Sequence, residues 1–120
     1  MSHIVLMEED RLMRSLLTEW LTDAGYRVDA IKHPAAANAA DADLVIVDVH
    51  NPRDVGLERL HTVRSRHPGA PIVAISGHFR PGVGAAGPAA EALGVERVLA
   101  KPIDREAFLD AVGSVVGPPR

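Results

Sequence analysis

The sequence has no cysteine, few aromatic residues and no long apolar run. Its 120 residues include no Cys, and Trp, Tyr and Phe together make up 3% of them. The lack of cysteine excludes disulfide bonds and thiolate metal sites, and it is compatible with a cytoplasmic location. The scarcity of aromatic residues argues against a surface on which nucleic-acid bases stack. No apolar run approaches the roughly 20 residues of a membrane span, and no secretory segment follows the first residue, so we expect no membrane association.

An excess of positive charge is also missing. Lys and Arg number 13 against 16 Asp and Glu, which gives a formal net charge of −3. This balance argues against direct nucleic-acid binding, which usually requires a basic surface. The length and the hydrophobic fraction of 47% are typical of one globular domain with one packed core.

Short apolar runs alternate with amphipathic stretches along the whole chain. Strands are predicted at 4–7, 28–31, 44–47, 72–75 and 97–100, and helices at 12–24, 34–40, 56–67, 88–93 and 108–116. Such alternation predicts an α/β fold of the flavodoxin-like, doubly wound (βα)5 type. We expect a five-stranded parallel sheet in the order 2-1-3-4-5, with helices on both faces.

Polar residues follow four of the predicted strands, where ligands bind in folds of this type. They are Glu8, Glu9 and Asp10 after the first strand, Asp48 after the third, Ser76 after the fourth and Lys101 after the fifth. Converging carboxylates repel each other unless a cation such as Mg²⁺ lies among them. A single acid at a strand end is more often solvated or a helix N-cap, and we interpret Asp10 in that way. The joint placement indicates a phosphoryl-transfer site with an Asp nucleophile.

With these residues in this order, the chain resembles the receiver domains of response regulators from about residue 4 to residue 116. The matching features are Glu8-Glu9, the run Asp48-x-x-x-Pro52-x-x-x-Gly56-Leu57, Ser76, and Lys101-Pro102. The resemblance implies a signalling switch of two-component systems or phosphorelays, phosphorylated by a histidine kinase or a phosphotransfer protein. It implies no enzyme activity beyond catalysis of its own phosphorylation and slow autodephosphorylation.

The resemblance also assigns roles to individual residues. Asp48 is the expected phosphoacceptor, and Ser76 and Lys101 are expected to hold phosphoryl oxygens. Mg²⁺, or Mn²⁺ in its place, is expected to bind Glu9 and Asp48 directly, Glu8 through water, and the backbone carbonyl of His50. The Lys101-Pro102 peptide bond is expected to be cis, as in the family.

Three departures from the family pattern concern the site and the switch. Glu9 stands where the family usually has Asp, and Asn51 replaces an apolar residue before Pro52. Val98 occupies a position where the family often has an aromatic ring that turns inward, so the usual aromatic switch is in doubt. Interior Gly and Pro break the stretch 79–94. We expect a loop there to about residue 87, then the short helix 88–93. The stretch is either a loop that varies without consequence in an Ala- and Gly-rich sequence, or a mobile segment that phosphorylation or a partner orders.

The histidines allow two interpretations. His50 and His78 each lie two residues beyond a site residue, so they are either ordinary surface histidines or groups that tune the lifetime of the phosphoryl group with pH. The other histidines share no metal-site spacing and are interpreted as structural or solvated; they are His3, His33, His61 and His67. Trp20 is expected at the core or its edge.

The functional expectation is a receiver domain at 1–117 with a short tail at 118–120 and no effector domain. Output would then be protein contact with an unknown partner, or a homodimer, through the fourth helix, fifth strand and fifth helix. Whether the protein stands alone or was cut from a larger regulator is left open. The alternative is a degenerate receiver that binds partners without phosphorylation. A flavodoxin-like electron carrier is disfavoured, because Glu8, Glu9 and Asp10 would repel a cofactor phosphate.

Overall fold

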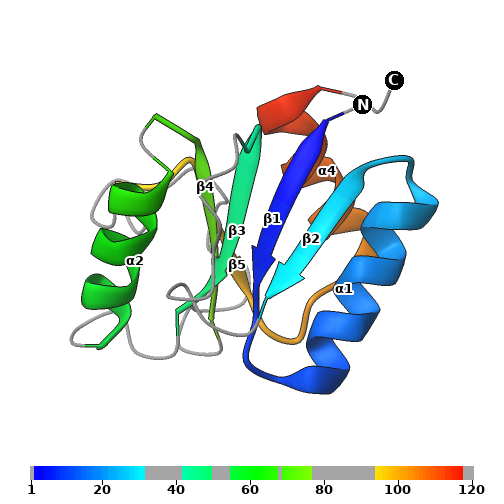
Figure 1. The fold of residues 1–120 in the computed structure, drawn as a ribbon. Coiled ribbons are helices and arrows are strands. Elements are labelled where there is room, and N and C mark those ends of the chain that lie inside the picture. The colour runs from blue at the N-terminus through cyan, green and yellow to red at the C-terminus, as the bar shows by residue number, and fades with distance from the viewer. Residues whose placement is uncertain (1, 32–41, 50–54, 68, 77–93, 118–120) are drawn as a thin grey trace.

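The predicted strands form a single parallel sheet (Figure 1). The structure, a computed structural model, describes residues 2–31, 42–49, 55–67, 69–76 and 94–117. Its strands are β1 His3–Met7, β2 Arg27–Ile31, β3 Leu44–Asp48, β4 Ile72–Ser76 and β5 Arg97–Ala100. Their order is β2-β1-β3-β4-β5, and every neighbouring pair is parallel. The predicted flavodoxin-like sheet is therefore confirmed.

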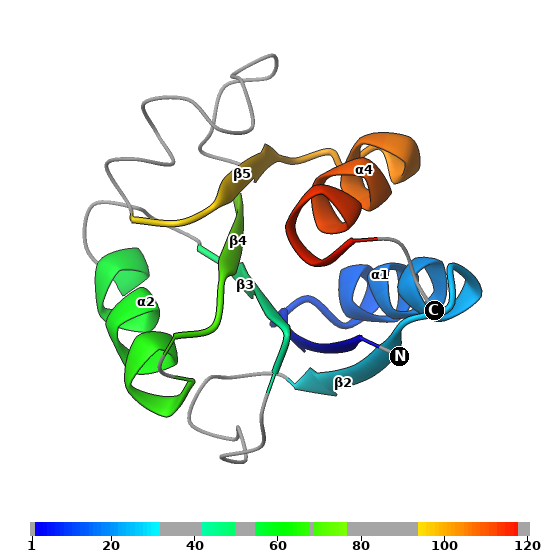
Figure 2. The same cartoon turned by 90° about the horizontal axis from the view of Figure 1, so that it is seen from above.

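Helices cover both faces of this sheet. The described helices are α1 Arg11–Asp23, α2 Val55–Arg66 and α4 Arg105–Val116. Figure 2 shows α2 on one side of the sheet and α1 and α4 together on the other. The helices predicted at 34–40 and 88–93 lie outside the described residues.

Alternate residues of each central strand enter two separate cores. In β1, Ile4 and Leu6 pack on the side of α1 and α4, whereas Val5 and Met7 pack on the side of α2. The same alternation recurs in β3 and β4, where all five residues of each strand are buried. Burial on both faces explains why these strands are continuous apolar runs in the sequence.

The N-cap of helix α1 is Asp10, whose side chain accepts a hydrogen bond from the backbone N–H of Leu12 at 3.1 Å. This confirms Asp10 as a helix-start residue. Leu17 and Leu21 are fully buried, but Leu12 is 82% exposed and Leu16 39% exposed. The predicted apolar stripe of this helix is thus wider than the face that packs. The first turn of α1 lies beyond the carboxyl ends of the strands and has no sheet beneath it (Figure 1).

Two contacts join α1 and the turn after it to α4. Trp20 is partly buried against the core, and its ring centroid lies 6.0 Å from that of Phe108, so its predicted place at the core edge is confirmed. The Tyr26 hydroxyl donates a hydrogen bond to the carbonyl of Gly117 at 3.0 Å. Next to it, the N–H of Arg27 donates to the carbonyl of Ser2 at 3.0 Å. Ser2 and Gly117 therefore both lie at the amino end of the sheet.

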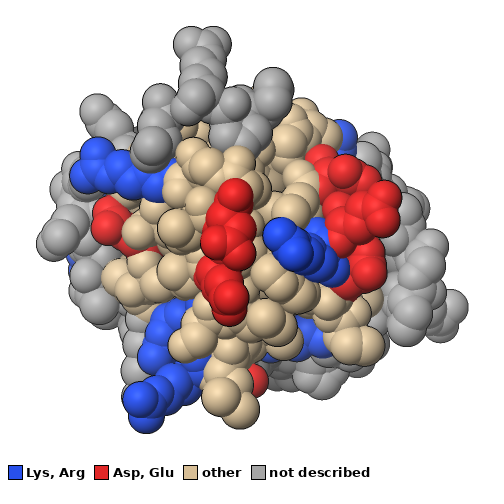
Figure 3. Space-filling view, turned by 90° about the vertical axis from the view of Figure 1, so that its right-hand side faces the viewer, with Lys and Arg blue, Asp and Glu red and all other residues tan. Residues whose placement is uncertain are grey.

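Charged side chains are dispersed over the face that carries α1 and α4. Figure 3 shows acidic patches there that are separated by basic and uncharged surface. The exposed acidic residues of these two helices are Glu19, Asp23, Glu106 and Asp110. Among the described residues that Figure 3 shows, the basic side chains lie in separate groups rather than in one continuous surface. Among the described helices, none combines the length and the apolar character needed to cross a membrane.

Candidate functional site

The carboxyl ends of the strands are held together by main-chain hydrogen bonds that continue one residue past the sheet. These bonds run from Glu8 N to Ile31 O at 3.1 Å, from Val49 N to Ile75 O at 2.8 Å, and from Lys101 N to Ser76 O at 3.1 Å. They fix the backbone on either side of each strand end. The carboxyl ends of β1, β3, β4 and β5 consequently lie together at one edge of the sheet.

A lysine and two buried carboxylates form the centre of this edge. Glu8 and Asp48 are each 1% exposed. The Lys101 ammonium nitrogen lies 3.4 Å from Glu8 Oε2 and 3.4 Å from Asp48 Oδ1. Its side chain is 24% exposed, so one end of the cluster opens to solvent. The structure thus brings together Glu8, Asp48 and Lys101, as the sequence predicted.

The electrostatics of this cluster act most strongly on Glu8. Burial raises the pKa of its carboxyl from 4.5 to about 7, and the neighbouring Asp48 adds to the rise. The N–H of Asp10, which donates to Glu8 Oε1 at 3.1 Å, and the charge of Lys101 lower the pKa but do not cancel the rise. Near neutral pH the metal-free protein therefore holds Glu8 partly protonated.

This pKa predicts how the stability of the metal-free protein depends on pH. Because folding raises the pKa of Glu8 from 4.5 to about 7, its contribution to the free energy of unfolding is fully present below pH 4.5 and is lost as the pH rises through 7. We expect a loss on the order of 2 kcal/mol. Urea unfolding with a chelator present, for wild type and Glu8→Gln at about pH 5 and about pH 8, measures it. An equal pH dependence in both proteins would contradict the prediction.

The residues present fit a hard divalent cation. Glu8 Oε2 is buried and accepts no hydrogen bond from any described residue, although Lys101 lies beside it. A cation bound between Glu8 and Asp48 would satisfy this oxygen, and Mg²⁺ commonly takes one or two carboxylates and completes its shell with water. Within the described ranges, however, no three acidic or histidine side chains form a group able to hold a metal. The direct role of Glu9 therefore stays a prediction.

Ser76 and Val98 lie on the two neighbouring strands at this side of the sheet. Ser76 ends β4 and is fully buried. Val98 is 2% exposed, is paired with Ala74 in the sheet, and packs in the core on the side of α2. A valine held in this way fills the core and has no ring to turn.

Other sequence predictions at the site have different outcomes. The Lys101-Pro102 peptide bond is cis, as predicted. His50, Asn51, Pro52 and His78 lie outside the described residues, so their predicted roles stay predictions.

Arg14 also belongs to the site, although its place there was not predicted from the sequence. Its guanidinium Nη1 donates to the carbonyl of Glu8 at 2.9 Å and lies 3.5 Å from that of Glu9. Helical side chains point back toward the start of their helix, so an arginine in the second turn can reach the loop before it. The position of Arg14 in the second turn after the acidic pair was therefore the sequence feature from which this contact could have been predicted.

The family is decided by comparison with known proteins. Residues 4–113 match the model of the response regulator receiver domain. The chain belongs to this family. Receiver domains are signalling switches of two-component systems, and they interact with histidine kinases or phosphotransfer proteins. They generally bind Mg²⁺ at the phosphorylation site.

Curated relatives of this receiver domain are longer regulators. The response regulator protein FleR of Pseudomonas aeruginosa is 32% identical over 115 residues, which are 91% of this chain and 23% of FleR. The transcriptional regulatory protein GlrR of Escherichia coli is 29% identical over 92% of this chain and 25% of its own length. The chain thus spans about a quarter of the length of these two relatives.

Solved structures share the fold of this receiver domain. The chemotaxis protein CheY4 of Vibrio cholerae has a TM-score of 0.76 and 26% identity, with 96% of this chain and 98% of that chain covered. A response regulator of Burkholderia pseudomallei, solved with a phosphorylated aspartic acid, a calcium ion and citrate, has a TM-score of 0.71 and 23% identity. It covers 92% of this chain and 66% of its own.

Proposed function

We propose that Asp48 is the phosphoacceptor of this receiver domain and that its phosphorylation depends on Mg²⁺. The observation that carries the proposal is the position of Lys101, whose ammonium lies 3.4 Å from both buried carboxylates, Glu8 and Asp48. Two buried acids and a cation at the carboxyl edge of a parallel sheet are the groups that phosphoryl transfer requires. The phosphoryl donor would be a histidine kinase or a phosphotransfer protein.

In the proposed step, an oxygen of Asp48 attacks phosphorus and forms a P–O bond. The P–N bond to the donor histidine breaks, and its electron pair leaves on the imidazole nitrogen, so the product is an acyl phosphate. Lys101 and the Ser76 hydroxyl would bind oxygens of the transferred group. Bound Mg²⁺, or Mn²⁺, would neutralise charge on these oxygens. The metal would be held by Glu9, Asp48 and the carbonyl of His50, and by Glu8 through water.

The proposal includes how the signal ends and where it goes. Attack by water on the acyl phosphate would restore the Asp48 carboxylate and release phosphate, and this slow self-catalysed step would be the only turnover. Output would be contact with another protein, and a cytoplasmic location belongs to the proposal because donors charged from ATP are made there. Because Val98 has no ring to turn, the conformational response would use groups other than an aromatic at this position.

Intact-mass measurement tests the proposal directly. Wild type, incubated with a small phosphoryl donor and Mg²⁺, is expected to gain the mass of one phosphoryl group, and Asp48→Asn is expected to gain none. Adding a chelator should abolish the gain in wild type. No gain in wild type would favour the degenerate receiver instead. An equal gain in Asp48→Asn would contradict the assignment of Asp48 as the phosphoacceptor.

A second experiment concerns the lifetime of the phosphoryl group. If His50 and His78 assist or block the attacking water, the dephosphorylation rates of His50→Ala and His78→Ala should depend on pH differently from wild type between about pH 6 and pH 8, where imidazole titrates. Release of phosphate after removal of the donor gives the rates. Unchanged rates across this range would remove both histidines from the proposal, and His61→Ala, on the exposed side of α2, is the matched control.

A further inference from the structure

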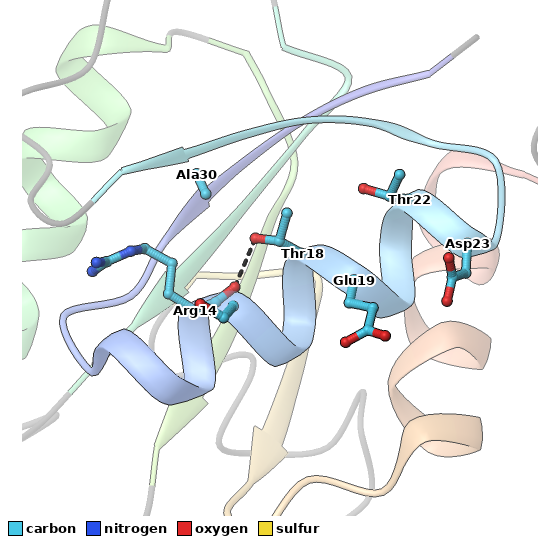
Figure 4. Close-up of a pocket in the computed structure, with 7 residues that line it drawn as sticks. Arg14, Thr18, Glu19, Thr22, Asp23 and Ala30 are labelled. Atoms are coloured by element: carbon cyan, nitrogen blue, oxygen red, sulfur yellow. Dashed lines mark hydrogen bonds between the residues drawn. The ribbon is translucent and has the colours of Figure 1, made fainter.

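Arg14 links the first helix to the loop that presents the acidic pair. The residue is half-buried in the second turn of α1. Figure 4 shows its side chain extending from α1 back toward the start of the helix, at one end of a surface groove between α1 and Ala30 of β2. Its Nη1 donates to the carbonyl of Glu8 at 2.9 Å and lies 3.5 Å from the carbonyl of Glu9. One guanidinium therefore contacts the backbone of both acids.

The rest of this loop is held by short-range contacts. The N–H of Asp10 donates to Glu8 Oε1 at 3.1 Å, and the carbonyl of Asp10 accepts from the N–H of Arg14 at 2.8 Å. These bonds tie the loop to itself and to the first helical turn. In contrast to these short-range contacts, Arg14 reaches the Glu8 and Glu9 carbonyls with a charged side chain. Hydrogen bonds from a charged donor are about twice as strong as neutral ones.

We propose that Arg14 is a positioning residue that sets the affinity of this site for divalent cations by fixing the backbone of Glu8 and Glu9. The inference rests on the proposed Mg²⁺ site. Mg²⁺ requires near-ideal octahedral geometry, so freedom in the backbone that carries its ligands lowers affinity. The requirement is stricter at Glu9, because glutamate has one more rotatable bond than the aspartate usual in the family.

Whether removal of Arg14 weakens or strengthens Mg²⁺ binding distinguishes a positioning role from a purely electrostatic one. Arg14 is a cation near a cation site, so by Coulomb's law its removal alone would make Mg²⁺ bind more tightly. Positioning predicts the opposite result, because removal frees the loop. A role in global stability alone predicts a lower free energy of unfolding and an unchanged affinity in the folded protein.

The test compares Arg14→Met, which keeps the apolar stem, with Arg14→Lys, whose ammonium can reach one carbonyl. Arg11→Met is the matched control, because Arg11 is an exposed arginine of the same helix. Mg²⁺ affinity is measured by titration calorimetry on protein shown to be folded by circular dichroism. Amide hydrogen exchange of Glu9 and Asp10 is measured in the metal-free protein.

We expect Arg14→Met to bind Mg²⁺ about tenfold more weakly and to exchange the two loop amides faster, as for other residues that orient metal ligands. Arg14→Lys should recover part of the Mg²⁺ affinity and part of the protection of the loop amides from exchange. Arg11→Met should match wild type in both quantities. Equal or tighter binding by Arg14→Met would overturn the inference. If Arg14→Met does not fold, wild-type affinity in Arg14→Lys would overturn it. If wild type itself bound no Mg²⁺, the proposed metal site would fail, whereas unchanged exchange in Arg14→Met would refute the role of Arg14 alone.

Discussion

Replacing Lys101 with methionine is expected to lower the free energy of unfolding of the metal-free protein by roughly 3 kcal/mol at about pH 8. The ammonium lies 3.4 Å from an oxygen of each buried carboxylate. Without it, Glu8 and Asp48, each 1% exposed, lose the ammonium charge that lies between them. Removing one partner of a buried ion cluster is costly because the remaining charges stay desolvated. Urea unfolding in the presence of a chelator measures the loss.

The size of this loss should depend on pH and on Mg²⁺. At about pH 5 Glu8 takes up a proton, because its pKa in the folded protein is about 7, and the repulsion is relieved. Adding Mg²⁺ at about pH 8 should restore much of the stability by ligand binding. In Glu8→Gln the same lysine substitution should cost less, and the difference gives the coupling energy. A loss that is equal at both pH values and in both backgrounds would contradict this account.

Replacing Phe108 with alanine is expected to destabilise the protein by about 4 kcal/mol. Phe108 is fully buried in the core between the sheet and the helices α1 and α4, and its ring contacts that of Trp20. The substitution removes a large apolar side chain and leaves a cavity that the helices close only in part. A loss of this size is a large fraction of the total stability of a small domain. Urea unfolding followed by Trp20 fluorescence measures it.

The control for Phe108→Ala is Leu12→Ala in α1. Leu12 is 82% exposed, so truncating it removes a large apolar side chain without opening a cavity. We expect its effect on the free energy of unfolding to stay within about 0.5 kcal/mol. A comparable loss in the two variants would mean that the core does not close around Phe108 as described.

The sheet was predictable because both of its faces are covered. Strands buried on two faces must be apolar at every position, so β3 and β4 stand out as continuous runs. The strand order followed from the alternation of strands and helices. The centre of the site was also predictable, since Asp48 ends β3 and Lys101 directly follows β5, and the carboxyl ends of these parallel strands must meet.

Other features depend on geometry that the sequence pattern does not contain. The apolar spacing of α1 includes Leu12 and Leu16, but periodicity does not reveal where the sheet beneath a helix ends. His67 was interpreted only as structural or solvated, and it is 5% exposed at the end of α2. Glu8 and Glu9 are adjacent residues of the same type, and only the family resemblance assigned them different contacts with the metal. The backbone turn after β1 makes them different, because it buries the Glu8 side chain against Lys101 and leaves Glu9 half-buried.

The bond between Tyr26 and Gly117 has a practical consequence for following phosphotransfer. It holds the end of α4 beside the start of β1, while Asp48 lies at the opposite end of β3, a strand of five residues. That strand separates the two ends of the sheet by roughly 15 Å. A fluorescent label or a fusion tag joined through either end of the described chain would therefore be anchored away from Asp48. Such a tether would leave the site around Asp48 accessible to the phosphoryl donor, so a tagged protein can be used to measure phosphotransfer rates.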